Sequence, residues 1–227
     1  MDKVLIVGGS KGIGRATLAL LLETYEVVNM SRTAPDITHN QLEHHALDVL
    51  SDEIPKIDGV NKIIYCPGSI NLKPITSLKE DDFLEDFKIN VLGAVRVIKT
   101  YARNLKRAKN ASIVLFSSVA VRQGMPFHSS VAVAKAGVEG LTKSLAAEMA
   151  PNVRVNCIAP SMTDTPLASA ILKNEQAIER IQERHPLKRI MEAEDIAKMA
   201  VFLISEDARA MTGQVVGIDA GMGALKL

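Results

Sequence analysis

Short runs of apolar residues recur along the chain, and most are separated by stretches with helical periodicity. The runs predict strands at residues 3–7, 26–30, 42–47, 60–65, 112–116, 153–158 and 214–218. Apolar residues at helical spacing predict helices over 12–23, 81–103, 131–149, 167–183 and 193–204. Near-continuous apolar strands that alternate with helices indicate a parallel sheet covered on both faces. We therefore expect an α/β fold with a Rossmann-type doubly wound parallel sheet in three layers.

The length and composition fit one domain. With 227 residues, of which 47% are hydrophobic, the chain can enclose one well-buried core. No internal repeat, low-complexity tract or long linker divides it, so residues 1–227 are expected to form a single domain. The segment 161–186 carries apolar residues between charges, which predicts a small mobile lid over a pocket. The same apolar residues would also serve an ordinary core.

Charge and cysteine usage narrow the classes of partner. Lys and Arg total 27 against 26 for Asp and Glu, and aromatic residues make up 4%, so nucleic acid is not expected as a partner. No apolar run has the length of about 18 residues that a membrane span needs, and none resembles a signal peptide, so we expect a cytoplasmic protein. Cys66 and Cys157 lack the paired spacing of a metal site, and the adjacent His44 and His45 should point to opposite faces of a strand. No metal site is expected.

A glycine-rich turn follows the first predicted strand and precedes the first predicted helix. The stretch VGGSKGIGRA places Gly8, Gly12 and Gly14 in the spacing G-x-x-x-G-x-G. Glycine permits positive φ and close approach of a ligand to the backbone, and the helix N-terminus offers N–H groups to a pyrophosphate. A P-loop would need Lys and then Ser or Thr after the last glycine, but Arg15 and Ala16 stand there. The flanking strand and helix favour a dinucleotide site over an ordinary glycine-rich turn.

The end of the second predicted strand indicates which dinucleotide is preferred. Proteins that bind NAD place an acidic residue there to hold the ribose hydroxyls, whereas this chain has Ser31 and Arg32. An arginine would pair with a 2′-phosphate, and Lys11 in the glycine turn would add a second positive charge. NADP is therefore expected in preference to NAD. The alternative is that both cations are solvated surface charges.

Further motifs follow in a fixed order and cover essentially the whole chain. They are GGSKGIG, LDV with Asp48, YCPG with Gly68, INVLG with Asn90, IVLFSSV with Ser118, KAGVEGLTKSLAAEMA after Lys135, VRVNCIAPSMTDTP with Thr165, and MTGQVVGIDAGM. Together they resemble the short-chain dehydrogenase/reductase superfamily. The chain departs from the family pattern at Val7, at Tyr65 and Cys66 where asparagines are usual, and at Ser161 where glycine is usual. The turn and the resemblance together predict cofactor contacts at Gly8, Ser10, Lys11, Gly12, Ile13, Gly14, Arg32, Asp48, Gly68, Lys135, Pro160, Thr163 and Thr165.

The resemblance also implies a catalytic set of Asn, Ser, Tyr and Lys. Asn90 would kink its helix and anchor a proton-relay water. Ser118 would bind the substrate oxygen, and Lys135 would hold the nicotinamide ribose and lower the pKa of a proton-donating tyrosine. Ser118 lies thirteen residues before position 131 and Lys135 four residues after it, so the tyrosine position is occupied by Val131. Valine can transfer no proton.

Replacement of the tyrosine leaves two functional hypotheses open. A positioned acid contributes roughly 10²- to 10⁴-fold to such a reaction. His128 is a candidate substitute acid, although a lone histidine at that place also suits a polar pocket wall; Ser129 and Ser130 are expected to be N-caps of the following helix. The first hypothesis is an NADP-dependent oxidoreductase with non-standard or impaired proton donation to a carbonyl or alcohol substrate. The second is an NADP-binding pseudoenzyme with a sensor or structural role.

Two features indicate the partners. Ala132, Ala136 and Gly140 are spaced by four in the helix at 131–149, so another helix can approach closely, unless this stripe packs on the parent sheet. By resemblance, this helix and the one near 81–103 would build a homodimer or a homotetramer. Met125 and Phe127 predict an apolar pocket wall, and hence a small apolar carbonyl or alcohol substrate.

Overall fold

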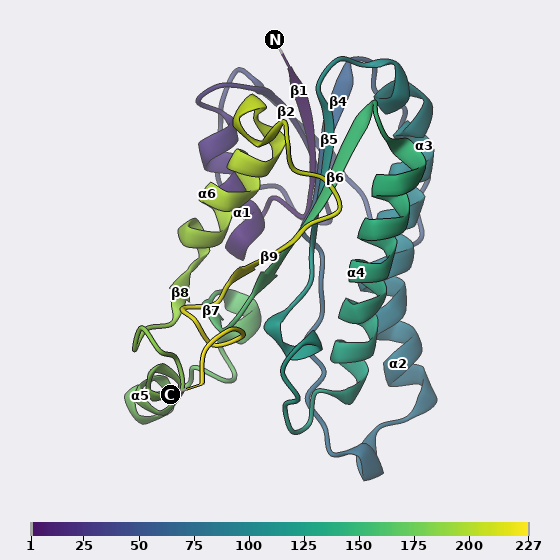
Figure 1. The fold of residues 1–227 in the computed structure, drawn as a ribbon. Helices are drawn as coiled ribbons and strands as arrows, with labels where there is room; N and C mark the ends of the chain where they lie inside the picture. Colours follow the sequence, from purple (N-terminus) through teal and green to yellow (C-terminus); the bar gives the residue numbers. More distant parts are fainter. Residues whose placement is uncertain (1, 227) are drawn as a thin grey trace.

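A seven-stranded parallel sheet forms the middle layer of the computed structural model, which describes residues 2–226 (Figure 1). The strand order is β3-β2-β1-β4-β5-β6-β9, and every neighbouring pair runs parallel. The doubly wound sheet expected from the apolar runs is confirmed, with strand ends shifted by one or two residues. The strands are β1 (Lys3–Val7), β2 (Glu26–Ser31), β3 (Leu42–Ala46), β4 (Val60–Tyr65), β5 (Ala111–Phe116), β6 (Val153–Pro160) and β9 (Val215–Ile218).

Helices cover both faces of this sheet. One face carries α1 (Gly12–Leu21) and α6 (Ala193–Ile204), and the other carries α2 (Glu80–Phe87), α3 (Gly93–Arg107) and α4 (Ser129–Met149) (Figure 1). Short 3₁₀ turns lie at Ile75–Ser77, Val119–Val121, Pro166–Ala168 and Glu206–Ala208. Within the described part of the chain, no helix is both long and apolar enough to cross a membrane.

One apolar core lies on each face of the sheet, and together they explain why the strands appear in the sequence as nearly continuous hydrophobic runs. Leu5 and Val7 of β1 belong to the core beneath α3 and α4, whereas Val4 and Ile6 belong to the core beneath α1 and α6. Successive side chains of a strand point to opposite faces, so a strand that is covered on both sides must be apolar at every position.

The winding of the chain reverses between β1 and β4, which are neighbours in the sheet. Val7, at the end of β1, is paired with Tyr65, at the end of β4. Ligands of doubly wound sheets bind in the crevice outside the carboxyl ends of the strands at such a reversal. The glycine turn and the segment after β4 therefore lie where a ligand is expected.

The helix predicted over 81–103 is interrupted. It divides into α2, one π-helical turn at Lys88–Leu92, and α3. A π-helical turn leaves backbone groups out of register, and the Tyr65 hydroxyl donates to the Ile89 carbonyl oxygen over 2.7 Å. A side chain at Gly93 would overlap this hydroxyl. Asn90, where the family resemblance implies a kink, lies in this turn, and its Nδ2 donates to the Asp86 carbonyl oxygen over 2.8 Å. The apolar periodicity alone does not show the interruption, because the Tyr65 contact comes from β4.

The helix predicted over 167–183 is also shorter than expected. Only α5 (Glu175–Glu183) is α-helical, and the Asn174 side chain caps it by accepting from the Ala177 N–H over 2.9 Å. The segment that contains α5 lies beyond the main sheet (Figure 1). Its two ends are joined by a two-stranded sheet of β7 (Thr163–Asp164) and β8 (Met191–Glu192). Strands of two residues are too short to leave a hydrophobic pattern.

Candidate active site

The glycine turn adopts a conformation that needs its glycines. Gly8 and Gly12 have φ of +81° and +52°, and a side chain at Gly14 would overlap the Gly8 carbonyl oxygen. No side chain caps the N-terminus of α1, where Lys11 occupies the N-cap position. A Cβ added at Gly12 would lie 3.3 Å from the Thr165 side chain, so the turn touches the segment after β6. The first N–H groups of α1 are therefore available to an anion.

Polar contacts join this turn to the end of β2. The buried Asn29 side chain accepts from the Gly9 N–H over 2.9 Å, and the Thr33 hydroxyl donates to Ser10 Oγ over 3.2 Å. These bonds hold the start of the turn next to the residues that follow β2. Asn29 was not singled out in the sequence, because a buried amide in a strand leaves no periodic signal.

Two exposed cations flank the turn. Arg32 directly follows β2, and Lys11 precedes α1; both side chains are exposed. Arg15, the other cation of the turn, pairs with Asp36, with 2.6 Å between Nε and Oδ1. The Asp48 carboxylate accepts from the Leu50 N–H over 2.9 Å, which fixes the turn after β3. Lys11 and Arg32 are thus the cations best placed to meet a phosphate at this edge of the sheet.

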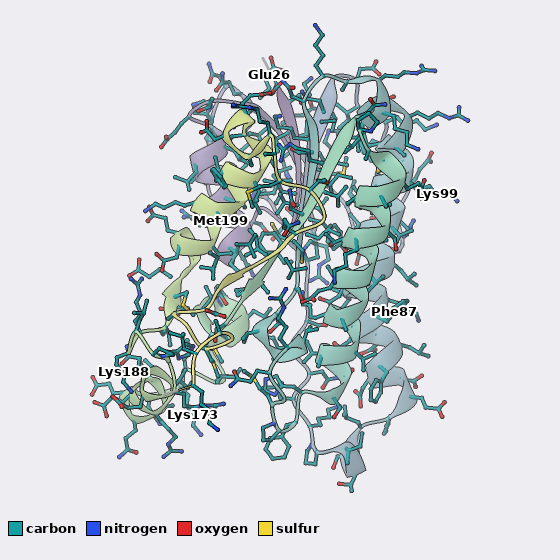
Figure 2. The ribbon with its side chains drawn as sticks, in the orientation of Figure 1. Glu26, Phe87, Lys99, Lys173, Lys188 and Met199 are labelled. Carbon is teal, nitrogen blue, oxygen red and sulfur yellow. The ribbon has the colours of Figure 1, made fainter. Side chains whose placement is uncertain are left out.

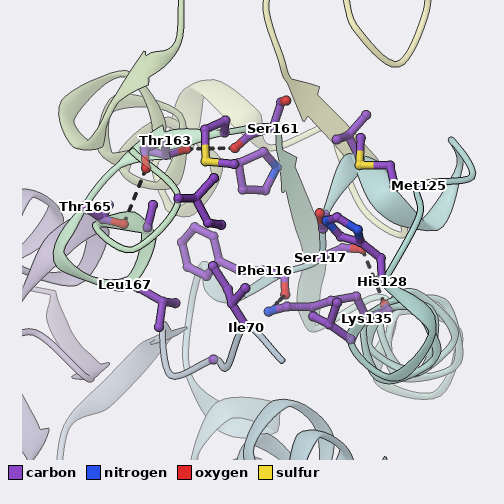
Figure 3. A pocket seen from close by; sticks show the side chains of 18 of the residues that line it. Ile70, Phe116, Ser117, Met125, His128, Lys135, Ser161, Thr163, Thr165 and Leu167 are labelled. Atoms are coloured by element: carbon purple, nitrogen blue, oxygen red, sulfur yellow. Dashed lines mark hydrogen bonds between the residues drawn. The ribbon is translucent and has the colours of Figure 1, made fainter. Parts of the chain in front are cut away.

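A cavity of about 290 Å³ opens beside the turn at the carboxyl ends of β4, β5 and β6 (Figure 3). Most of its wall is apolar, and polar groups lie at a few points. Six of the thirteen predicted cofactor positions line it: Ile13, Gly68, Lys135, Pro160, Thr163 and Thr165. Among the predicted catalytic residues it brings together Ser118, His128 and Lys135, and it includes Val131.

Lys135 is held in the cavity wall by α4. Its side chain is 8% exposed, and Nζ donates to the Phe116 carbonyl oxygen over 2.9 Å (Figure 3). Burial lowers the pKa of Lys135 to about 8, against a smaller opposing effect of Cys157, Asp86 and Cys66. Among residues 2–226, no carboxylate forms an ion pair with Lys135. The ammonium form is therefore poorly compensated in this wall.

Val131 lies one helical turn before Lys135 and is 6% exposed. It places a small apolar surface on the cavity at the position that the sequence resemblance aligns with a tyrosine. No tyrosine lines the cavity. Tyr65 donates to the Ile89 carbonyl, and Tyr101 donates to the Pro55 carbonyl over 2.6 Å. No tyrosine from another element therefore replaces the missing hydroxyl in the cavity wall.

Ser118 and Ser117 face different partners. Ser118 Oγ accepts from the Ala120 N–H over 3.2 Å and lines the cavity, so its hydroxyl proton remains available to a substrate oxygen. Ser117 also borders the cavity, but its hydroxyl donates to Glu139 Oε1 over 2.8 Å. The geometry favours Ser118 as the donor, as the sequence predicts.

His128 precedes α4 and occupies its N-cap position. Its Nδ1 lies 2.7 Å from the Pro126 carbonyl oxygen. A carbonyl can only accept, so Nδ1 carries the hydrogen, and Nε2 is the nitrogen that can exchange a proton with the cavity. The prediction that Ser129 and Ser130 are N-caps is wrong, because the helix begins at Ser129 and both serines lie in its first turn.

Ser130 instead joins a buried polar network beneath the cavity. Its Oγ lies 2.6 Å from Oδ2 of Asp86, which is 1% exposed, and the Ser69 hydroxyl donates to Oδ1 of the same carboxylate. Asn90 Nδ2 donates to Ser69 Oγ over 3.1 Å, and Asn90 Oδ1 has no partner among the described residues. The sequence did not reveal Asp86, because the acidic residues around it in α2 resemble a solvated helix face.

A second polar pair, also missed, joins the two ends of the segment 161–186. Ser161 Oγ lies 2.7 Å from His185 Nε2, and His185 Nδ1 lies 2.7 Å from the Ile181 carbonyl oxygen. His185 is 1% exposed and lines the cavity from the lid side. The only available signal was Ser161 itself, where the family usually has glycine.

Comparisons with known proteins agree with this geometry. The family model described as enoyl-(acyl carrier protein) reductase matches residues 10–223. The chain is 30% identical to the probable galactose dehydrogenase GalD of Rhizobium meliloti over 96% of this chain and 94% of that protein. It is 31% identical to the 3-oxoacyl-(acyl-carrier-protein) reductase FabG of Thermotoga maritima over 96% of each chain.

The chain belongs to the short-chain dehydrogenase/reductase superfamily. Solved structures agree: ElxO with bound NADP superimposes with a TM-score of 0.89 over 99% of each chain at 26% identity. A short-chain dehydrogenase family protein from Francisella tularensis also gives a TM-score of 0.89 at 26% identity, over 99% of this chain and 100% of that one. The curated relatives named above are dehydrogenases and reductases, so membership of this superfamily places the chain among oxidoreductases.

Proposed function

We propose that this protein is an NADP(H)-dependent oxidoreductase that acts on a small carbonyl or alcohol substrate with non-standard or impaired proton donation. The observation that carries the proposal is that Ser118 and Lys135 line one cavity beside the glycine turn, while Val131 replaces the proton donor between them. On this proposal, Ser118 would orient a substrate and Lys135 a cofactor, and the hydroxyl that would complete the set is missing from position 131.

The residues fit a phosphorylated dinucleotide. The backbone at Gly8 and Gly12 and the uncapped N-terminus of α1 suit a pyrophosphate, and the exposed Lys11 and Arg32 suit a 2′-phosphate. A bound nicotinamide would supply or accept the hydride. ElxO, whose structure matches this one, binds NADP. The absence of an acidic residue directly after β2 further supports NADP over NAD.

Proton transfer is the step in which this chain differs. Hydride addition to a carbonyl leaves an alkoxide that must gain a proton. Ser118 can hydrogen-bond that oxygen. His128 also borders the cavity, and its imidazole Nε2 is the candidate proton donor. Without any positioned acid, the reaction loses roughly 10²- to 10⁴-fold, or about 3 to 5.5 kcal/mol.

A second candidate function is an NADP-binding pseudoenzyme with a sensor or structural role. The specific observation in its favour is the apolar, buried Val131 in the cavity wall. Such a protein would use the glycine turn and Lys135 to bind cofactor without appreciable turnover. The presence of Asn90, Ser118 and Lys135, the other members of the catalytic set that the resemblance implies, favours the enzyme.

The cavity wall defines the expected substrate. Ile70, Met125, Met162 and Leu167 contribute apolar surface, and the lid segment closes one side (Figure 3). A volume of about 290 Å³ suits a small molecule. We therefore favour a small, largely apolar carbonyl or alcohol compound.

The exposed face of α4 supports a homodimer or homotetramer. Ala136 and Gly140 are exposed, and no atom lies within 4 Å of a Cβ added at Gly140, so the predicted stripe does not pack on the parent sheet. Phe87 of α2 and Val133 of α4 add exposed apolar surface. Phe87 lies on the side of the molecule that α2 and α4 form (Figure 2). Another copy of α4 could approach this face closely.

The decisive test is NADPH oxidation with a panel of small ketones and aldehydes. Wild-type activity that His128→Ala abolishes, with NADPH binding unchanged, would support an enzyme with His128 as the acid. Wild-type activity that His128→Ala leaves intact would exclude that role and retain the oxidoreductase. NADPH binding without turnover on any compound would favour the pseudoenzyme, and absence of binding would end both.

A further inference from the structure

Lys135 has the surroundings of a reactive amine rather than of a paired cation. Among residues 2–226, the amine has one hydrogen-bond partner, the Phe116 carbonyl oxygen, which lies 2.9 Å away. A neutral amine carries two N–H groups and one lone pair, so it can keep this bond while the lone pair points elsewhere. An ammonium ion in the same place would be left without a counter-charge at ion-pair distance, which burial makes costly.

Lys135 and Gly68 both belong to the cavity wall. Gly68 has no side chain, and a Cβ placed there would lie 3.3 Å from Lys135 Nζ. Val131, one turn before Lys135 in α4, has no polar side-chain atom that could form a hydrogen bond with the amine. Burial raises the pKa of the Cys66 thiol to about 12, so Cys66 stays protonated near neutral pH and supplies no negative charge.

Burial also favours the neutral form of the amine. With a pKa of about 8, Lys135 carries a neutral fraction near pH 7.5 that is on the order of 100-fold larger than that of an ordinary lysine. A lysine desolvated in an apolar pocket is one of the established ways in which proteins prepare an amine for attack on a carbonyl.

We propose that Lys135 is a nucleophile that forms an imine with small aldehydes and methyl ketones entering this cavity. The Nζ lone pair attacks the carbonyl carbon, and a proton moves from nitrogen to oxygen to give a carbinolamine. The carbinolamine expels hydroxide to give an iminium ion, and the proton that the iminium gives up converts this hydroxide to water and leaves the neutral imine. The carbonyl oxygen leaves as water, and no oxidant or reductant is consumed.

This reactivity goes beyond the proposed redox function and belongs to the cofactor-free protein. When NADPH is bound, the family resemblance places its nicotinamide ribose on Lys135, so the amine is engaged. Cofactor and carbonyl compound are then expected to compete for the same side chain.

Reductive trapping tests the proposal on the full chain. Wild-type protein is incubated near pH 7.5 with acetone and sodium cyanoborohydride, and the initial rate of isopropyl addition at each lysine is followed by peptide mass spectrometry. Lys143 is exposed on the same helix and serves as the internal control. We expect modification at Lys135 to be at least about ten-fold faster than at Lys143, reflecting the larger neutral fraction.

Two variants and one ligand sharpen the result. Lys135→Arg should show no adduct at position 135, and Val131→Tyr should slow the reaction by placing a ring beside the amine. Equal rates at Lys135 and Lys143, or no adduct at Lys135, would overturn the proposal even if the protein binds NADPH. Trapping at Lys135 that NADPH does not slow would instead uphold the nucleophile and count against the proposed cofactor site.

Discussion

Lys135 Nζ and the Phe116 carbonyl oxygen lie 2.9 Å apart and tie α4 to the end of β5. This contact places an amine in the wall of the cavity without a carboxylate to neutralise it. The same arrangement has a measurable cost for folding, because the unfolded chain would hold the lysine as a fully solvated ammonium ion.

The pH dependence of stability should reveal that cost. Burial lowers the pKa of Lys135 to about 8, below its ordinary value, so between about pH 8 and about pH 10.4 the unfolded state binds more protons than the folded state. As pH rises through that window, the cost of burying the charged Lys135 disappears, and the free energy of unfolding increases. At pH 7 we expect Lys135→Met to be more stable than the wild type by on the order of 2–3 kcal/mol, and by much less at pH 10.

Urea denaturation of both proteins at pH 7 and pH 10 measures this difference. A gap between variant and wild type that is the same at both pH values would show that burial of the charge is not the cause.

Restoring a hydroxyl at position 131 should restore proton donation. We expect Val131→Tyr to raise the rate of NADPH-dependent ketone reduction by roughly 10²- to 10⁴-fold, because a phenol beside Lys135 would act as the acid. Val131→Phe adds the same ring without the hydroxyl and should leave the rate near that of the wild type. The rates are compared at saturating NADPH. An equal increase in rate in both variants would mean that the aromatic ring, and not proton donation by the hydroxyl, causes the increase.

The π-helical turn should depend on Tyr65 and Gly93 together. Tyr65→Phe leaves the Ile89 carbonyl without its donor and should lower the free energy of unfolding by about 1–3 kcal/mol. Gly93→Ala would push a methyl group into the Tyr65 hydroxyl and should be more damaging in the wild type than in the Tyr65→Phe background. Urea denaturation of the two single variants and the double variant gives the coupling energy. Strictly additive effects would contradict the contact.

Arg32 should set the preference between cofactors. Arg32→Asp removes the cation expected to meet the 2′-phosphate and adds a carboxylate suited to ribose hydroxyls, so NADPH affinity should fall roughly 10- to 100-fold while NADH affinity rises. Arg103→Asp makes the same change of charge at an exposed position of α3 and serves as the control. Nicotinamide fluorescence titrations give both affinities. An equal loss of NADPH affinity in the Arg103→Asp variant would show that the change in overall charge, and not a contact with the 2′-phosphate, causes the effect.

The regular part of the fold could be predicted because each element carries its own pattern. The central strands are mostly apolar where they are covered on both faces, with buried exceptions such as Asn29 in β2 and Lys62 in β4, and α6 matches the range predicted for it. The glycine turn was also visible, because positive φ at Gly8 and Gly12 demands a residue type that stands out in the sequence.

The remainder depends on contacts between distant segments. His185 meets Ser161 across the lid, and Ser130 meets Asp86 between α4 and α2. Ser130 and Asp86 lie in helices, whereas Ser161 follows β6 and His185 follows α5. Side chains of these types normally face solvent, so no local pattern marks Ser130, Asp86 and His185 as buried. The interruption at Lys88–Leu92 likewise needs the hydroxyl of a residue in β4.

Calorimetric titration of the wild-type protein with NADPH, alongside NADH, tests most directly that the glycine turn and Arg32 form a site for a phosphorylated dinucleotide. The structure predicts saturable binding of NADPH, with NADH binding more weakly. No binding of either nucleotide, or tighter binding of NADH, would contradict it.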